Sequence, residues 1–287
     1  MRPDLPRGPR VQSQAGRHWG RGLLIAVVLL YVGALVLAPL AGLVAGALEG
    51  GLAALGAALV EPGLLAAFGR TLLIAVIVVA VHAVCGTALA WVMVRQRFTG
   101  RRWLNGLIDL PFAVSAVVAG YMLLLLFGRR GWLAPVLEAL DLQIVFAFPS
   151  LVLATLFVTL PFMTRELMPV LEAFGIEQEQ AAATLGASGW QTFWLVTFPA
   201  LRWGFIYGVT LTFARALGEF GAVLVVGGGI SGRTDTATIF IFRALEERQY
   251  VSAYGSALAR GVLSLAVVLG SSLLRRRMER QKNPILS

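Results

Sequence analysis

Two charged residues stand inside an apolar stretch, and their spacing brings them together. Arg215 and Glu219 are four residues apart, which places them on one face of a helix. Charged side chains inside a membrane-spanning segment pair with one another, face the bundle interior or line a water-filled path. Arg260, in another apolar stretch, could face such a path or extend its charged end to the membrane surface. Two interpretations stay open for these residues: a mutual ion pair, or a path or gate for a charged solute.

A second group of residues shares a polar connection between two apolar stretches. Its alanines are small enough to let a helix lie close against a partner, and its glycine permits a sharp change of chain direction. Its proline ends the connection before the next apolar stretch. A short rigid helix held in this way could transmit a push from a motor protein to the membrane. The group consists of Gln180, Ala181, Ala182, Gly186, Val196, Phe198 and Pro199.

The sequence also excludes several kinds of chemistry. A nucleotide-binding P-loop needs a lysine followed by Ser or Thr, but the one lysine, Lys282, precedes Asn283. The two histidines, His18 and His82, cannot form a zinc-protease motif, and the single cysteine excludes an internal disulfide. We therefore expect no catalytic residue, no cofactor and no metal site. ATP hydrolysis, if it drives this protein, must come from another chain.

The composition predicts a membrane protein. Of 287 residues, 58% are hydrophobic and 14% are charged, with a mean hydropathy of +0.80. Soluble domains carry about 25% charged residues, so a water-soluble enzyme and a disordered chain are both excluded. The net charge of +9 would suggest nucleic acid in a soluble protein, but cytoplasmic loops of membrane proteins are themselves rich in arginine. We expect the lipid bilayer as a partner and no nucleic acid.

Six apolar runs approach or exceed the roughly 20 residues that a helix needs to cross a bilayer. They are continuous and lack alternation, which favours helices over a β-barrel. A shorter run, Leu52–Val60, predicts a helix at the membrane surface or outside it. The six predicted spans are Leu23–Ala47, Thr71–Val94, Leu110–Phe127, Ile144–Met163, Phe205–Val226 and Ala253–Leu274.

The basic residues predict the orientation of these spans. With six spans, 16 basic residues fall on the side of both termini and 6 on the opposite side. Basic residues concentrate on the cytoplasmic side, so both termini are expected in the cytoplasm. The long connection 165–203 is then cytoplasmic too, and its length indicates structure or function of its own.

The spacing of the second group resembles the EAA loop of type I ABC importer permeases. That loop reads E-A-A, three residues, G, nine residues, I-x-L-P, and every spacing matches, with Gln180 in place of Glu and Phe198 in place of Leu. Residues 158–221 are also similar to sulfate/thiosulfate permeases of the CysW type. The run Ala-Arg-Ala-Leu-Gly-Glu-Phe-Gly-Ala at 214–222 carries much of this resemblance, which extends over 23–274.

The resemblance implies an all-α integral membrane protein with six transmembrane helices in the type I ABC importer permease fold. It would be one transmembrane half of a sulfate/thiosulfate importer in the bacterial inner membrane. The implied partners are a homologous second permease, a dimer of ATPase subunits and a periplasmic sulfate/thiosulfate-binding protein. The expected divisions are a cytoplasmic tail (1–22), a first helix and connector (23–66), a permease domain (67–274) containing the coupling loop (165–203), and a second tail (275–287).

Several alternatives stay open. Molybdate and tungstate permeases share the Gly-Glu-Phe-Gly-Ala element, and segment 231–248 lacks a Leu-Pro pair usual in the family. A secondary anion transporter that works without ATP would predict an internal repeat, and none is visible. A membrane anchor without a path would leave Arg215 and Glu219 unexplained. Because a carboxylate repels an oxyanion, Glu219 is expected to be a structural or gating partner of Arg215.

Overall fold

The computed structural model describes the backbone of residues 15–282 and the side chains of residues 21–270. Most of the two predicted tails therefore lies outside the described residues. Every regular element in the described part of the chain is a helix, which confirms the all-α fold class. The elements are α1 (Ala15–Leu48), α2 (Gly51–Leu59), α3 (Pro62–Arg95), α4 (Arg101–Ala113), α5 (Ala116–Phe127), α6 (Ala134–Ala139), α7 (Phe148–Phe174), α8 (Glu177–Thr184), α9 (Gly189–Thr192), the π-helix η1 (Phe193–Thr197), α10 (Phe198–Leu217), α11 (Gly221–Gly227), α12 (Ala237–Glu246) and α13 (Tyr250–Lys282).

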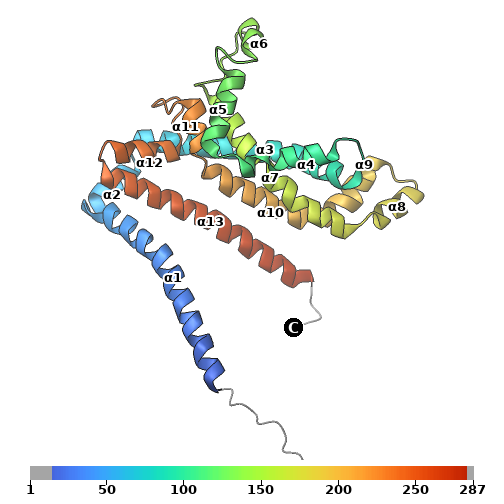
Figure 1. The fold of residues 1–287 in the computed structure, drawn as a ribbon, viewed down its shortest axis with the longest axis horizontal. Coiled ribbons are helices and arrows are strands. Elements are labelled where there is room, and N and C mark those ends of the chain that lie inside the picture. The colour runs from blue at the N-terminus through green and yellow to red at the C-terminus, as the bar shows by residue number, and fades with distance from the viewer. Residues whose placement is uncertain (1–14, 283–287) are drawn as a thin grey trace, which may run out of the picture.

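Four long helices form the body of the molecule (Figure 1). Helix α7 packs against both α3 and α10, and α10 packs in turn against α13. The short helices α8 and α9 lie at one end of this bundle, and α2 and α12 lie at the other. Helices α5 and α6 project from the side, and α1 leaves the bundle beyond its contacts with α13 and α2.

Membrane-spanning proportions are clear for four helices: Arg21–Leu48, Pro62–Arg95, Phe148–Phe174 and Tyr250–Gly270. The count among the described residues reaches six if each of two bent pairs is one span. The pair α4 and α5 bends by 117°, and α9–α10 bends against α11 by 55°.

The third and fifth predicted spans are thus broken helices. Helix α4 stops at Ala113, and α5 restarts after Ser115, whose hydroxyl accepts the backbone N–H of Val118 at 3.3 Å. A serine in this position satisfies an N–H that the new helix would otherwise leave unpaired. The fifth span breaks at residues 218–220, between α10 and α11.

Glycines allow close contact between the long helices. A Cβ on Gly208 would lie 2.6 Å from Met163 Sδ, and one on Gly204 would lie 2.9 Å from Val170 Cγ2, so α10 meets α7 where side chains are absent. Because lipid competes for apolar contact, membrane helices associate through such close packing rather than through water exclusion.

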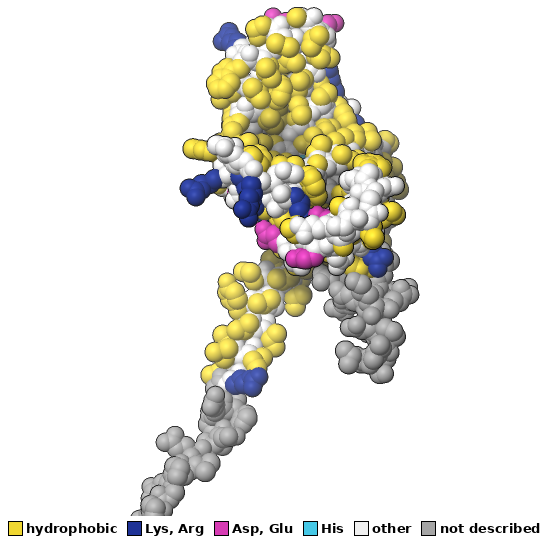
Figure 2. Space-filling view, turned by 90° about the vertical axis from the view of Figure 1, so that its right-hand side faces the viewer, with side chains coloured by type: hydrophobic (Ala, Val, Ile, Leu, Met, Phe, Trp, Pro, Cys, Tyr) yellow, Lys and Arg dark blue, Asp and Glu magenta, His cyan; other side chains and the backbone are white. Residues whose placement is uncertain are grey.

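The outer surface is apolar over most of its extent. None of the most apolar window of α1 is buried, so this helix is hydrophobic on all sides and available to lipid or a partner. In the view from the α8–α9 end, charged side chains gather around that end and at the tip of the α5–α6 projection (Figure 2).

Candidate functional site

The predicted coupling residues form a helical elbow at one end of the bundle, which we call the α8–α9 elbow (residues 175–199). Helix α8 leads into a turn at Gly186, whose φ of +86° is unfavourable for residues with a Cβ. Helix α9 then starts at a capping box, in which Ser188 and Gln191 each bond the other's backbone N–H. The glycine is needed here for its backbone conformation, since a Cβ at Gly186 would meet nothing within 4 Å.

The structure brings all seven residues of the group into this elbow. Gln180, Ala181, Gly186 and Pro199 are exposed, and the other three, Ala182, Val196 and Phe198, are half-buried.

Large apolar side chains lie on the same elbow without cover. The exposed fractions are 89% for Leu185, 71% for Trp190 and 75% for Leu195. Exposed apolar groups gathered on one projection mark a surface for a partner.

Aromatic rings stiffen the elbow where it enters α10. Trp194 packs against Trp190 with ring centroids 5.6 Å apart, and against Phe198 at 5.1 Å. Phe198 also packs against Phe205, about two turns into α10, with ring centroids 5.4 Å apart. Edge-on and tilted contacts of this kind are favourable beyond their buried area. These ring contacts join α9 to the first two turns of α10.

A buried ion pair anchors the elbow to the bundle. Arg95, at the end of α3, bonds Glu179 through Nε at 3.0 Å and also donates to the carbonyls of Leu171 (3.2 Å) and Gly175 (2.5 Å). The hydroxyl of Thr197 donates to Glu179 Oε1 at 2.9 Å. One carboxylate thus joins α3, α8 and η1.

Sequence reasoning missed Glu179. The resemblance drew attention to Gln180, where the family has a glutamate, and the structure places a carboxylate one residue earlier. Its partner Arg95 is 84 residues away, so no local spacing reveals the pair.

The intramembrane charges meet at the break between α10 and α11. Arg215 Nη2 lies 2.8 Å from Glu219 Oε2, and Glu219 Oε1 accepts the backbone N–H of Ala222 at 3.2 Å. The Glu219 side chain is 2% exposed and that of Arg215 is 33% exposed. The hydroxyl of Thr238, on α12, donates to the Glu219 carbonyl at 2.7 Å and so holds the break in place.

Arg260 reaches the same break from α13. A Cβ on Gly218 would lie 3.6 Å from Arg260 Nη2, so the guanidinium lies close to the interrupted backbone. The three charged residues predicted from two separate apolar stretches therefore gather in one place.

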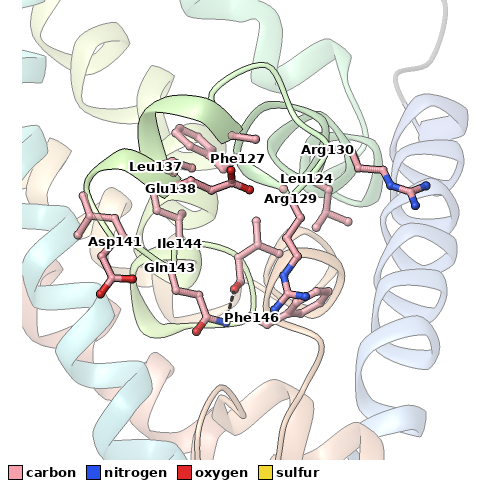
Figure 3. A pocket seen from close by; sticks show the side chains of 14 residues that line it. Leu124, Phe127, Arg129, Arg130, Leu137, Glu138, Asp141, Gln143, Ile144 and Phe146 are labelled. Atoms are coloured by element: carbon pink, nitrogen blue, oxygen red, sulfur yellow. Dashed lines mark hydrogen bonds between the residues drawn. The ribbon is translucent and has the colours of Figure 1, made fainter.

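A hollow of about 850 Å³ lies in the α5–α6 projection, within the size range of ligand sites. Leu124, Arg129, Glu138 and Phe146 are among its lining residues (Figure 3). Arg130 points away from it in this view. No pattern in the sequence predicts this hollow, because it depends on the chain folding back after α6.

A second hollow, of about 270 Å³, lies at the α2–α12 end beside a charged cluster. Asp235 is almost fully buried and pairs with Arg70, which also donates to the carbonyls of Asp235 (2.8 Å) and Gly232 (3.1 Å). Arg243 donates to the Gly229 carbonyl at 2.5 Å. These bonds fasten the loop after α11 to α3 and to α12.

Helices of membrane-spanning length, two broken helices, one of them with charged residues at its break, and a projecting elbow define a polytopic membrane transport subunit. Residues 82–283 match the family described as binding-protein-dependent transport system inner membrane component, and the chain belongs to that family.

Relatives with assigned names are similar along nearly the whole chain. The sulfate transport system permease protein CysW of Synechococcus elongatus is 46% identical, over 90% of both chains. CysW of Escherichia coli K12 is 41% identical, over 92% of this chain and 91% of the relative. The chloroplastic sulfate permease 2 of Chlamydomonas reinhardtii is 44% identical, over 91% and 70%.

Solved structures show the same fold at low identity. A chain of a bacterial ABC transporter involved in the import of the acidic polysaccharide alginate matches with a TM-score of 0.79 and 16% identity, covering 94% of this chain and 99% of that one. The same kind of transporter in complex with its pentasaccharide-bound periplasmic protein gives 0.77 and 16%, over 94% and 98%. The predicted type I ABC importer permease fold is confirmed.

Proposed function

We propose that this chain is the permease subunit of an importer that moves sulfate or thiosulfate into the cytoplasm, driven by a separate ATPase. The observation that carries the substrate is the similarity, at 41–46% identity, to permeases named for sulfate transport. The observation that carries the energy source is the α8–α9 elbow, an exposed and firmly anchored surface in a chain that lacks a P-loop.

The elbow receives the ATPase dimer. Exposed Leu185 and Trp190 offer apolar contacts, and Gln180 with its neighbouring alanines presents a narrow helix face. When ATP draws the two ATPase subunits together, the elbow moves with them. The Arg95–Glu179 pair and the ring contacts then carry this movement to α3 and α10, which turn against the second permease.

In this function the chain has one orientation in the membrane and a binding protein on its outer side. The elbow, the tails 1–22 and 275–287 and both termini lie on the cytoplasmic side of a bacterial inner membrane. The segment 23–66 precedes the permease domain 67–274, whose loop 165–203 contains the elbow. The hollow in the α5–α6 projection faces outward, and its mixed charge suits a periplasmic sulfate/thiosulfate-binding protein.

The charged residues at the helix break belong to the path or its gate. Arg215 holds Glu219 in an ion pair, so the carboxylate is occupied while an anion passes. Arg260 lies beside this pair and leaves positive charge in excess there.

Uptake of labelled sulfate tests the proposal, in cells that lack their own sulfate permease and receive this chain with its neighbouring subunits. We expect ATP-dependent uptake that Gly186→Trp abolishes and that excess molybdate leaves nearly unchanged. Saturable molybdate uptake without sulfate uptake would replace the substrate by molybdate or tungstate. Uptake that survives both loss of the ATPase and Gly186→Trp would refute ABC transport in favour of a secondary transporter.

A further inference from the structure

Arg260 differs from three other arginines of the bundle in having no partner among the residues whose side chains are described. Arg95 pairs with Glu179, Arg165 with Asp109, and Arg215 with Glu219. Arg260 makes no hydrogen bond or ion pair with any residue whose side chain is described, and its Nε is buried.

Arg260 lies at the middle of Tyr250–Gly270, a helix long and apolar enough to cross a membrane. Arg260 is ten residues after Tyr250, the first residue of α13, which corresponds to about 15 Å along the helix. The hydrocarbon core is about 30 Å thick. An uncompensated charge at that depth is unfavourable and is found where it serves an ion path.

Two hydroxyl groups lie on the same face of α13. Ser252 and Ser256 precede Arg260 by eight and four residues, and both are buried with side-chain oxygens that lack a partner among the described residues. A helical side chain leans over the turn before its own Cα. The Arg260 side chain therefore leans back over the turn that carries Ser256, so donors of two kinds lie on one face of α13.

The acid of the cluster is already engaged. Glu219 is held by Arg215 and by the backbone N–H of Ala222. With Arg215 and Arg260 positive and Glu219 negative, the cluster carries one positive charge in excess. A tetrahedral oxyanion accepts hydrogen bonds through several oxygens, which suits a guanidinium and neighbouring hydroxyls.

We infer that Arg260 and Ser256 form an oxyanion-binding point inside the membrane, where the transported anion pauses between entry and release. This inference rests on the proposed function and adds to it the residues that hold the substrate. The nearby carboxylate keeps the net charge small, so the anion is held weakly enough to leave, as conduction requires.

Arg260→Met separates a binding role from a structural one. It removes the unpaired charge, so the reconstituted importer, with its second permease, ATPase and binding protein, is expected to unfold at the wild-type temperature or higher. Labelled sulfate transported per ATP hydrolysed is expected to fall about tenfold to a hundredfold, the range for losing hydrogen bonds to a charged group. Arg260→Lys, which keeps the charge, is expected to restore part of the transport.

Ser256 and Ser264, four residues before and after Arg260, give a matched pair of variants. Ser256→Ala is expected to lower transport per ATP several-fold, whereas Ser264→Ala, one turn beyond Arg260 on the other side, is expected to leave it unchanged. Transport by Arg260→Met within twofold of wild type would overturn the inference. So would loss of assembly in both Arg260 variants, or equal losses in the two serine variants.

A result that refutes sulfate as the substrate is distinguishable from one that refutes the role of Arg260. If the wild-type importer carries molybdate and not sulfate, the proposed function fails in its substrate. The same variants are then measured with molybdate, and the role of Arg260 stands or falls on that series alone.

Discussion

Arg95 and Arg260 are both arginines of long helices in one bundle, but their surroundings differ in every respect. Arg95 donates to a carboxylate and two carbonyls at the elbow, and its side chain is 8% exposed. Arg260 lies near the helix break at Gly218 without a hydrogen bond to any described residue.

The difference indicates two uses of one side chain. A guanidinium with all its neighbours in place fixes the structure around it, because moving it breaks several bonds at once. A guanidinium without a hydrogen-bonding partner breaks no bond when it moves and stays available to a mobile anion. The elbow is therefore expected to be sensitive to small changes in bonding, and the break to changes in charge.

The largest effect is expected when Arg95, which bonds a carboxylate and two carbonyls, is removed. Arg95→Ala leaves Glu179, whose side chain is 17% exposed, without its cation, which costs about 3 kcal/mol, the lower end for a broken buried pair. Thermal unfolding of the purified permease complex measures this loss of stability. The amount of ATPase that co-purifies measures how well the elbow still binds its proposed partner. Adding Glu179→Ala to Arg95→Ala should recover part of the stability. A single variant as stable as wild type would contradict the anchoring role.

The next largest effect is expected when the ion pair between Arg215 and Glu219 at the break is changed. Glu219→Gln frees Arg215 to resemble Arg260, at about 1–3 kcal/mol for a lost partner, because Arg215 is one-third exposed. The excess charge at the break rises to two, so the anion is released more slowly and turnover falls. Stopped-flow uptake with labelled sulfate measures release, and Glu49→Gln, an exposed glutamate, is the control. Unchanged turnover would mean that charge at the break does not govern transport.

A smaller effect is expected from backbone strain in the elbow. Gly186→Ala places a Cβ in a left-handed conformation, which costs about 1–2 kcal/mol. Gly189 adopts no positive φ and has open space around it, so Gly189→Ala is the matched control. The ratio of transport to ATP hydrolysis should fall for the first variant and not for the second. Equal behaviour would show that the turn tolerates any residue.

Transport is expected to change least when the Glu179 carboxylate loses one hydrogen bond and keeps its arginine. Thr197→Val keeps the size of the buried side chain and removes its bond to Glu179, at about 1.5 kcal/mol, the lower end for a bond to a charged group. Since Arg95 still holds the carboxylate, transport should stay close to wild type while the unfolding temperature falls slightly. A loss of transport as large as that of Arg95→Ala would show that the hydroxyl, and not the arginine, positions the elbow.

Apolar run length predicted the long helices but not their ends. The run Ile144–Met163 predicted a span, yet α7 runs from Phe148 to Phe174. Hydropathy reports where apolar residues stop, while the helix continues through polar residues that bond at its surface, such as Arg165 with Asp109 at 2.8 Å.

The candidate site was visible in part for the same reason. The elbow follows from motif spacing within one connection, and Arg215 with Glu219 follows from their separation of four residues. Contacts between distant parts of the chain were out of reach, including Arg95 with Glu179 and the approach of Arg260 to Gly218. Each depends on how whole helices pack, which no local pattern records.

The number of residues in the π-helix η1 sets how α9 is rotated relative to α10. A π turn holds one residue more than an α turn, and each residue of an α-helix advances the chain by about 100° around the axis. The five residues Phe193–Thr197 therefore set the rotational phase between α9, which carries Trp190, and the glycine face of α10. Deleting one residue there would swing the exposed surface more than a quarter turn away from its partner. Within this segment the identity of a residue is freer to change than the number of residues.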